Sequence, residues 1–303
     1  MRPASPFGAL LDENPERSST IDVLGAPTRY WEYGPADAEI VLVLVHGFRG
    51  DHHGLDAICA HIRGIRIISP DLPGFGESAP LNGHAHNITG YALWLEALVG
   101  SLGLSGRAIL LGHSFGSIVV AAAMARGLET PQLILINPIA APALAGPNAI
   151  LSRITLGFYR LARALPHALG APLLSNWVAV RVMSLAMIKT RDPLLRRWVH
   201  QQHHAYFSSY ANRDSVLEGF EASIGSDVSM FAEQISVPTL LIGARNDPIS
   251  PVSAQQRLAT LIPQAQLEIF DNVGHLIHYE RPREAAELIV SFLNAGTVAE
   301  SST

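Results

Sequence analysis

Short apolar runs that alternate with helix-like segments constrain the fold of this 303-residue chain more than any other feature of its sequence. The runs are rich in valine, leucine and isoleucine, and a Gly, Ser, Asn, Asp or His follows each one, which is typical of strands buried on both faces. We expect a leading hairpin at 21–23 and 29–32, strands at 40–45, 65–68, 108–111, 133–136, 239–242 and 267–270, and helices at 55–62, 91–102, 117–126, 252–261 and 283–293. This alternation predicts an α/β fold in which helices cover both faces of a parallel sheet.

The alternation stops between residues 139 and 236. Helix-like stretches occupy 150–164, 178–188 and 193–210, with breaks expected at Pro166, Gly170, Pro172 and Pro193. This segment holds nine basic and six acidic residues, whereas the rest of the chain holds 12 and 20. We therefore expect a core formed by residues 1–138 and 237–303, with a helical cap inserted at 139–236 as a candidate lid.

The composition predicts a soluble protein with a large core, because 48% of the residues are hydrophobic, 16% are charged and the mean hydropathy is +0.22. The formal net charge is −5 and the only lysine is Lys189, so no polybasic tract is present to neutralise a nucleic acid. The longest apolar runs, 40–45 and 118–125, fall far short of the ~20 residues of a membrane span. The first 20 residues lack the apolar stretch of a secretory signal, and the single Cys59 excludes an internal disulfide. We expect a cytoplasmic protein with no nucleic-acid partner and no membrane span.

The most informative local motif is Gly112-His113-Ser114-Phe115-Gly116. It follows the predicted strand at 108–111 and opens the predicted helix at 117–126, which is the context of a nucleophile elbow. Small residues at 112 and 116 allow a sharp turn that pushes the Ser114 hydroxyl outward. The sequence therefore predicts Ser114 as a nucleophile.

A serine hydroxyl is a weak nucleophile at neutral pH and needs a general base, which in turn needs an orienting carboxylate. Among 13 histidines, His275 lies directly after the last predicted strand, and Asp247 lies in the loop after the strand at 239–242. Loops at the carboxyl ends of parallel strands are where such sheets place their chemistry. We predict that Ser114, Asp247 and His275 form a catalytic triad in this chain order.

The attacked carbonyl oxygen also needs hydrogen-bond donors for the negative charge that it develops. The loop His46-Gly47-Phe48-Arg49-Gly50 follows the strand at 40–45 and offers the backbone N–H of Phe48. The second donor is the N–H of Phe115, at the beginning of the helix after the nucleophile. Phe48 and Phe115 are thus the predicted oxyanion hole.

Taken in order, these motifs resemble the α/β-hydrolase family over nearly the whole chain: His46-Gly47, the loop Asp71-Leu72-Pro73-Gly74-Phe75-Gly76-Glu77-Ser78, the elbow, the Asp247 loop and Gly274-His275. The resemblance implies an eight-stranded sheet with one antiparallel strand, a helical cap over the site, and no cofactor or metal. It also implies that Ser114 is the nucleophile, His275 the base and then the acid, and Asp247 its partner. Epoxide hydrolases and haloalkane dehalogenases of this fold carry an aspartate where this chain has Ser114. Two departures are Ser117, where many members have glycine, and His113, which is common in esterases where carbon–carbon bond hydrolases usually have Asn.

These features predict a carboxylesterase-like serine hydrolase that cleaves small to medium carboxylic esters with an apolar part, through an acyl-enzyme. The alternatives are a carbon–carbon bond hydrolase of meta-cleavage products from aromatic degradation and a small-molecule receptor that retains the fold. His200, His203 and His204 have a possible metal-ligand spacing, but no acidic third ligand is near, so we interpret them as a polar helix face or pocket lining.

Overall fold

Within residues 4–142 and 149–300, which the computed structural model describes, eight strands form one sheet in the order β1-β2-β4-β3-β5-β6-β7-β8. Strand β2 runs antiparallel to both of its neighbours, and every other pair is parallel. The predicted eight-stranded, mostly parallel sheet is thus confirmed. The strands are β1 (Arg17–Val23), β2 (Ala26–Tyr33), β3 (Val41–Val45), β4 (Arg66–Pro70), β5 (Ile109–His113), β6 (Leu133–Ile136), β7 (Thr239–Ala244) and β8 (Ala265–Phe270).

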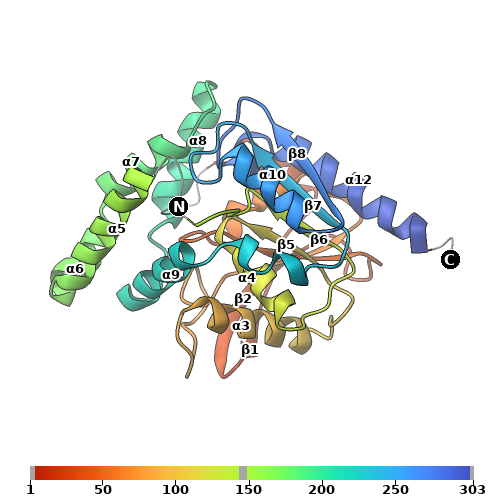
Figure 1. Cartoon of the computed structure of the whole chain (residues 1–303), viewed down its shortest axis with the longest axis horizontal. Helices are drawn as coiled ribbons and strands as arrows, with labels where there is room; N and C mark the ends of the chain where they lie inside the picture. The colour runs from red at the N-terminus through yellow and green to blue at the C-terminus, as the bar shows by residue number, and fades with distance from the viewer. Residues whose placement is uncertain (1–3, 143–148, 301–303) are drawn as a thin grey trace.

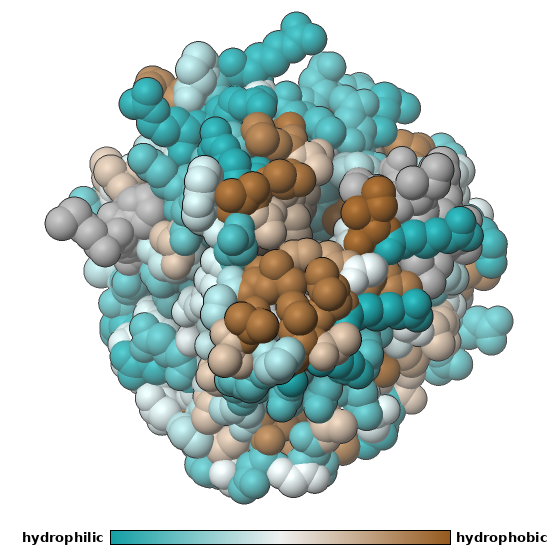
Figure 2. Space-filling model, turned by 90° about the vertical axis from the view of Figure 1, so that its left-hand side faces the viewer, coloured by the Kyte–Doolittle hydropathy of each residue, from teal (hydrophilic) through white to brown (hydrophobic). Residues whose placement is uncertain are grey.

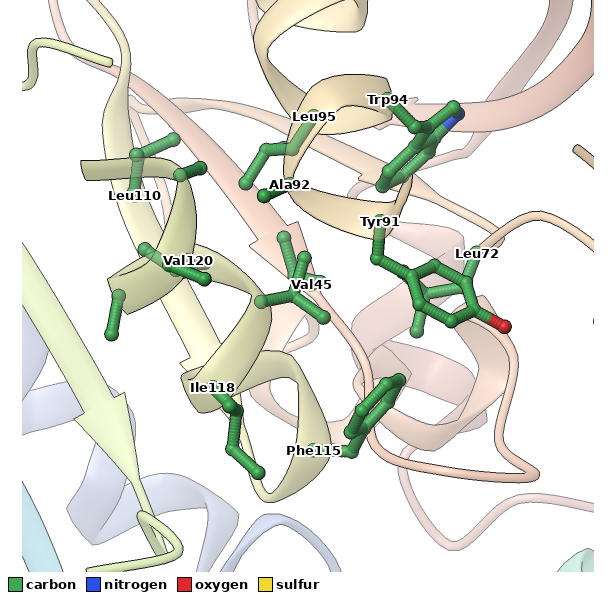
Figure 3. Packing of buried hydrophobic residues seen from close by; sticks show 14 of the residues in the cluster. Val45, Leu72, Tyr91, Ala92, Trp94, Leu95, Leu110, Phe115, Ile118 and Val120 are labelled. Carbon is green, nitrogen blue, oxygen red and sulfur yellow. The ribbon is translucent and has the colours of Figure 1, made fainter. Parts of the chain in front are cut away.

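Both faces of the central strands are buried. In β3, Val41, Val43 and Val45 face one apolar cluster, whereas Leu42 and Leu44 face another, as the two-residue period of a strand requires. Figure 3 shows the first of these clusters, in which side chains of α3 and α4 close around Val45. Burying one such side chain fully contributes roughly 1.5–3 kcal/mol, which explains why these runs contain almost no polar residues.

Helices cover the sheet on both sides (Figure 1). Residues of α3, α4 and α10 pack in the cluster around Val45, and residues of α2, α11 and α12 pack in the cluster around Leu44. These helices are α2 (Asp56–Cys59), α3 (Ile88–Ser101), α4 (Phe115–Ala125), α10 (Val252–Leu261), α11 (Ile277–Glu280) and α12 (Pro282–Glu300), and a short α1 (Gly8–Asp12) precedes the sheet.

All the longer elements that the structure describes between β6 and β7 are helices. We call α5–α9 the helical insertion. In Figure 1 its first four helices stand to the left of the sheet. Residues 143–148 of the predicted cap lie outside the described residues, and the domain boundaries at 138/139 and 236/237 remain predictions. The insertion contains α5 (Ala149–Ala164), α6 (His167–Leu174), α7 (Trp177–Met187), α8 (Pro193–Tyr206) and α9 (Arg213–Gly225), followed by the 3-10 turns η2 (Val228–Met230) and η3 (Ala232–Gln234).

Two of the breaks expected in this segment are wrong. Gly170 and Pro172 both lie inside α6, whereas Pro166 and Pro193 stand at helix beginnings, as expected. Gly170 is buried because α6 contacts α5 there: a Cβ at this position would lie 2.3 Å from the carbonyl oxygen of Ala162. The glycine therefore allows close packing of two helices rather than ending one.

Candidate active site

Ser114 lies in a sharp turn between β5 and α4. Its φ of 53° and ψ of −118° are unfavourable for a residue with a side chain, and a hydrogen bond from its N–H to the carbonyl of Ile136 (3.1 Å) helps to hold the turn. Gly116 is required because a Cβ there would lie 2.0 Å from the carbonyl oxygen of Val45. The turn leaves the Ser114 side chain partly exposed at the carboxyl end of the central strands.

The structure brings the three predicted triad residues together. His275 Nε2 lies 2.8 Å from Ser114 Oγ, and His275 Nδ1 lies 2.8 Å from Asp247 Oδ2. An ionised carboxylate only accepts hydrogen bonds, so Nδ1 carries a proton and donates a hydrogen bond to Asp247. Nε2 is then free to accept the hydrogen bond of the Ser114 hydroxyl.

Asp247 is held as a carboxylate although it is only 6% exposed. Burial alone would raise its pKa, but the imidazole of His275 and the backbone N–H groups of Ile249 and Ser250 keep the pKa below its ordinary value. The two N–H groups donate to Oδ1 over 2.8 and 3.1 Å, so Oδ2 stays available for His275. A charge at this place stabilises an imidazolium on His275.

Asn137, which sequence reasoning treated only as the end of a strand, positions this pair. Its Nδ2 donates to Asp247 Oδ2 (3.0 Å) and to the carbonyl of Gly274 (3.3 Å), so it joins the acid loop to the histidine loop. Its backbone has a φ of 45°, which asparagine tolerates better than most residues. The sequence signal that could have identified Asn137 is its position directly after a central strand, at the edge of the sheet where the active site was predicted.

Two backbone N–H groups flank Ser114 in sequence or in space. Phe115 is the first residue of α4, so its N–H has no partner within the helix. Phe48 follows β3 in the turn closed by the hydrogen bond from Gly50 N to Gly47 O (3.0 Å), and among the described residues no hydrogen bond uses the Phe48 N–H. A Cβ on Gly47 would lie 3.2 Å from Ser114 Cβ, so the loop that holds Phe48 lies directly beside the turn of Ser114.

A model of the alpha/beta hydrolase family matches residues 42–288, which include all of these groups. The chain belongs to this family. Residues 42–288 also span the helical insertion, so the match covers more than half of the chain.

The relatives that this hydrolase resembles are named for different substrates. It is 25% identical over 240 residues to 2-hydroxy-6-oxononadienedioate/2-hydroxy-6-oxononatrienedioate hydrolase 2 of Pseudomonas putida, covering 76% of this chain and 77% of that one. It is 24% identical to epoxide hydrolase A of Mycobacterium tuberculosis, covering 90% and 96%. A thermophilic esterase from Thermogutta terrifontis superposes with a TM-score of 0.71 at 25% identity, covering 92% and 99%. Hydrolase function is common to all three.

Arg49 ties the oxyanion loop of this hydrolase to the helical insertion. Its guanidinium is buried and donates to the carbonyls of Leu174 (2.8 Å) and Phe207 (2.9 Å) and to the hydroxyl of Tyr159 (3.2 Å). Leu174 ends α6 and Phe207 follows α8, so the charge lies at two helix C-termini, whose dipoles favour a cation. In the described part of the chain no carboxylate forms an ion pair with Arg49.

Replacing Arg49 with methionine should lower the free energy of unfolding by about 2–4 kcal/mol, because two buried carbonyls lose their donor. Urea unfolding measures this change. Arg49→Lys keeps the charge but cannot reach all three acceptors at once, so we expect its free energy of unfolding to lie between those of the parent and the methionine variant. Equal stability of the methionine variant and the parent would contradict the role of Arg49 in fixing the insertion.

Aromatic rings form an apolar wall around Phe48. Phe75 and Phe115 from the core, and Tyr159 and Phe220 from the insertion, all place their ring centroids within 5.7–6.3 Å of that of Phe48. Tyr159 and Phe220 stack on each other at 3.7 Å. The side of the site that adjoins the predicted oxyanion donors is therefore apolar and partly built by α5 and α9.

Buried histidines adjoin the other side of the site. The ring of His113 lies 5.7 Å from that of His275 and 4.0 Å from that of His278. Burial lowers the pKa of His113 to about 3 and, farther into the insertion, lowers that of His203 to about 3. It also lowers the pKa of His278 well below its ordinary value. These rings are neutral at physiological pH and add no positive charge beside His275.

The same histidines predict that this hydrolase loses stability in acid. A histidine whose pKa is lower in the folded state takes up a proton on unfolding below pH ~6.5, so its stabilisation is lost as the pH falls from there towards about 3. Each such group lowers the free energy of unfolding by roughly 1.4 kcal/mol per pH unit. Urea unfolding between pH 6.5 and 5 should show this slope. His203→Gln should lower the number of protons taken up on unfolding by about one, and the slope by the corresponding amount. An unchanged slope in that variant would refute the assignment.

The histidines with metal-ligand spacing are engaged elsewhere. Nδ1 of His200 and Nδ1 of His203 lie 2.7 and 2.6 Å from the Ser184 hydroxyl, which donates its single proton to one ring and accepts from the other. His204 is exposed. Both buried rings therefore anchor α8 to α7.

Asp51, His52 and His53 form another compact group, with ligand atoms within 4.8 Å of one another. Asp51 Oδ1 accepts from the N–H of His53 (3.0 Å), and His52 Nδ1 lies 2.9 Å from Asp71 Oδ1. His52 also stacks on Trp31, with ring centroids 3.2 Å apart. These contacts order the loop after β3.

Proposed function

We propose that this chain is a serine hydrolase that cleaves small to medium carboxylic esters through an acyl-enzyme, with Ser114, His275 and Asp247 as its catalytic triad. One observation carries the proposal: the imidazole of His275 bridges the Ser114 hydroxyl and the Asp247 carboxylate, with both heavy-atom distances at 2.8 Å. This is the arrangement in which a base removes the hydroxyl proton as the oxygen attacks.

In the acylation step, Ser114 Oγ attacks the ester carbonyl carbon while its proton passes to His275 Nε2. The carbonyl oxygen becomes an oxyanion, which accepts hydrogen bonds from the N–H groups of Phe48 and Phe115. The tetrahedral intermediate then collapses, the bond to the alcohol oxygen breaks, and that oxygen leaves with the proton from His275. Each oxyanion donor in such sites is typically worth ~2.7–4 kcal/mol of transition-state stabilisation.

Deacylation repeats these steps with water as the nucleophile. His275 removes a proton from a water molecule, the water oxygen attacks the acyl carbon, and the bond to Ser114 Oγ breaks as the proton returns to it. Asp247 keeps the imidazole in the required tautomer throughout and stabilises its charged form. The products are the free acid and the regenerated serine.

The walls of the site favour an ester with an apolar part. The rings around Phe48 offer dispersion contacts and a water-poor surface next to the oxyanion donors. His113 follows the pattern of esterases at its position. The substrate partner that we propose is accordingly a small-molecule ester with an apolar acyl or alcohol group.

A carbon–carbon bond hydrolase is the second candidate, and the resemblance to the Pseudomonas putida 2-hydroxy-6-oxononadienedioate hydrolase favours it. Such an enzyme would cleave a vinylogous diketone from aromatic degradation with the same three residues. The two candidates differ in the bond that breaks, so comparing their rates on matched substrates separates them.

The experiment is a turnover assay with p-nitrophenyl esters of increasing acyl length beside a ring-fission dienoate, together with labelling by a fluorophosphonate probe. We expect ester hydrolysis and labelling at Ser114. Faster cleavage of the dienoate than of every ester would favour the second candidate. Saturable ligand binding with negligible turnover would instead favour a receptor that retains the fold, and failure of the probe to label Ser114 would contradict every version with a serine nucleophile.

A further inference from the structure

The outer surface of helices α5–α8 is unusually apolar. Trp177 is 67% exposed and Leu194 is 76% exposed, although such side chains are normally covered. Figure 2, which views the molecule from the side where these helices stand, shows apolar residues gathered on this face within a hydrophilic surround. We call this surface the insertion face; its exposed apolar residues are Ile154, Leu161, Leu169, Trp177, Val178, Val182, Leu185 and Leu194.

Helical spacing shows that these residues form stripes rather than scattered positions. On α7, Val178, Val182 and Leu185 are separated by four and three residues, so they lie on one side of the helix. On α5, Ile154 and Leu161 are seven residues apart and share a side in the same way. The helices α5 and α7 thus each turn an apolar stripe outward, and Leu169 on α6 and Leu194 on α8 add single exposed apolar side chains.

Positive charge accompanies the outward stripes. Residues 149–197 contain eight basic residues and one acidic residue, a formal charge of +7, whereas the whole chain carries −5 and the remainder therefore −12. Arg153 and Arg160 are exposed, directly precede Ile154 and Leu161, and are themselves seven residues apart, so a basic stripe borders the apolar one on α5. Within residues 4–142 and 149–300 neither arginine forms an ion pair.

The helices are too short to cross a bilayer as they are folded here. The stretch from His167 to Met187 is long and apolar enough for a span by length and composition. The chain divides it at Ser175 and Asn176 into α6, with eight residues, and α7, with 11. At 1.5 Å per residue these reach about 12 and about 17 Å, against about 30 Å of hydrocarbon.

We propose that the insertion face docks on the surface of an anionic phospholipid bilayer. Exposed tryptophan, leucine and valine side chains together with an arginine stripe, as on α7 and α5 here, are the pattern of helices that lie in the headgroup region of a membrane. A second copy of the chain fits this face poorly, because a two-fold contact would bring its positive charges against the same charges of the partner. Neither the apolar stripes nor the charge depend on the proposed ester hydrolysis.

Vesicle sedimentation with the full chain tests this docking. We expect strong binding to phosphatidylcholine vesicles that contain phosphatidylglycerol, weak binding to phosphatidylcholine alone, and loss of binding at high salt. Arg153→Gln/Arg160→Gln should weaken binding to the anionic vesicles about 30-fold, and Leu169→Ser/Trp177→Ser should weaken it at least 10-fold. The other three tryptophans are buried, so a blue shift of fluorescence on binding reports on Trp177.

Matched controls lie outside the insertion face. Arg107→Gln/Arg257→Gln removes two exposed arginines and Met230→Ser removes an exposed apolar side chain, and both should bind like the parent. Every substituted side chain is on the surface, so thermal unfolding should confirm that all variants fold. Absence of binding to anionic vesicles, or equal binding by all variants, would overturn the proposal. The proposal would also be overturned if the parent were a dimer that did not bind vesicles and Leu169→Ser/Trp177→Ser were a monomer. That result would assign this face to a second copy of the chain.

Discussion

Replacing Ser114 with alanine should lower kcat/KM for p-nitrophenyl esters by about 10⁵- to 10⁶-fold, because the step that forms the acyl-enzyme loses its nucleophile. The residual rate would come from substrate binding and from the N–H groups of Phe48 and Phe115. Steady-state kinetics measures the loss, and a fluorophosphonate probe should label the parent but not the variant.

A second substitution at this position separates catalysis from folding. Ser114→Gly should be as inactive as Ser114→Ala but more stable than the parent by about 1 kcal/mol, because glycine adopts the positive φ of 53° without strain. Thermal or urea unfolding checks this gain. Substantial ester hydrolysis by either variant would place the nucleophile elsewhere, and a less stable glycine variant would mean that the Ser114 side chain supports the turn.

Asp247→Asn should have the second-largest effect, a fall in kcat of about 10⁴-fold. The N–H groups of Ile249 and Ser250 point at Oδ1, so the amide oxygen of an introduced asparagine must face them and its NH₂ group must face His275. The imidazole would then have to accept through Nδ1 and carry its proton on Nε2. A proton on Nε2 faces Ser114 and prevents it from acting as a base.

Asn137→Leu is the matched comparison for this result. It removes one donor to Asp247 Oδ2 but leaves the carboxylate and the tautomer of His275 unchanged. We expect a loss of about 10- to 100-fold, the scale of a supporting hydrogen bond next to a catalytic group. If Asp247→Asn lost no more activity than Asn137→Leu, the orienting carboxylate of the site would have to be another residue.

The sheet could be predicted from the sequence because its signal is local. Each of the six expected central strands overlaps an observed one, since a strand buried on both faces leaves a continuous apolar run and the residue after it opens a loop. The predicted hairpin was shorter than β1 and β2, which are exposed on part of their surface and mix polar with apolar residues. The elbow at Ser114 and the loops of Asp247 and His275 follow directly from the ends of these strands.

Contacts between distant segments were beyond what a local pattern indicates. Arg49 looked like a loop residue, because its three acceptors lie 110 to 158 residues further along the chain. Gly170 looked like a helix break, because the contact that requires a glycine there is with the carbonyl of Ala162 on the neighbouring helix. The helix α9 was not among the predicted ranges: it mixes apolar residues with charged and small polar ones, and Asn212, which caps it, resembles an ordinary loop asparagine.

The buried guanidinium of Arg49 sets a condition on protein engineering with this scaffold. A chimera that exchanged α5–α9 for the corresponding helices of a relative would retain the sheet and the three catalytic side chains. It would nevertheless leave a cation in the interior without acceptors, unless the donor segment ended two of its helices at the same points in space. Specificity grafts in this protein should therefore exchange residue 49 and the inserted helices together.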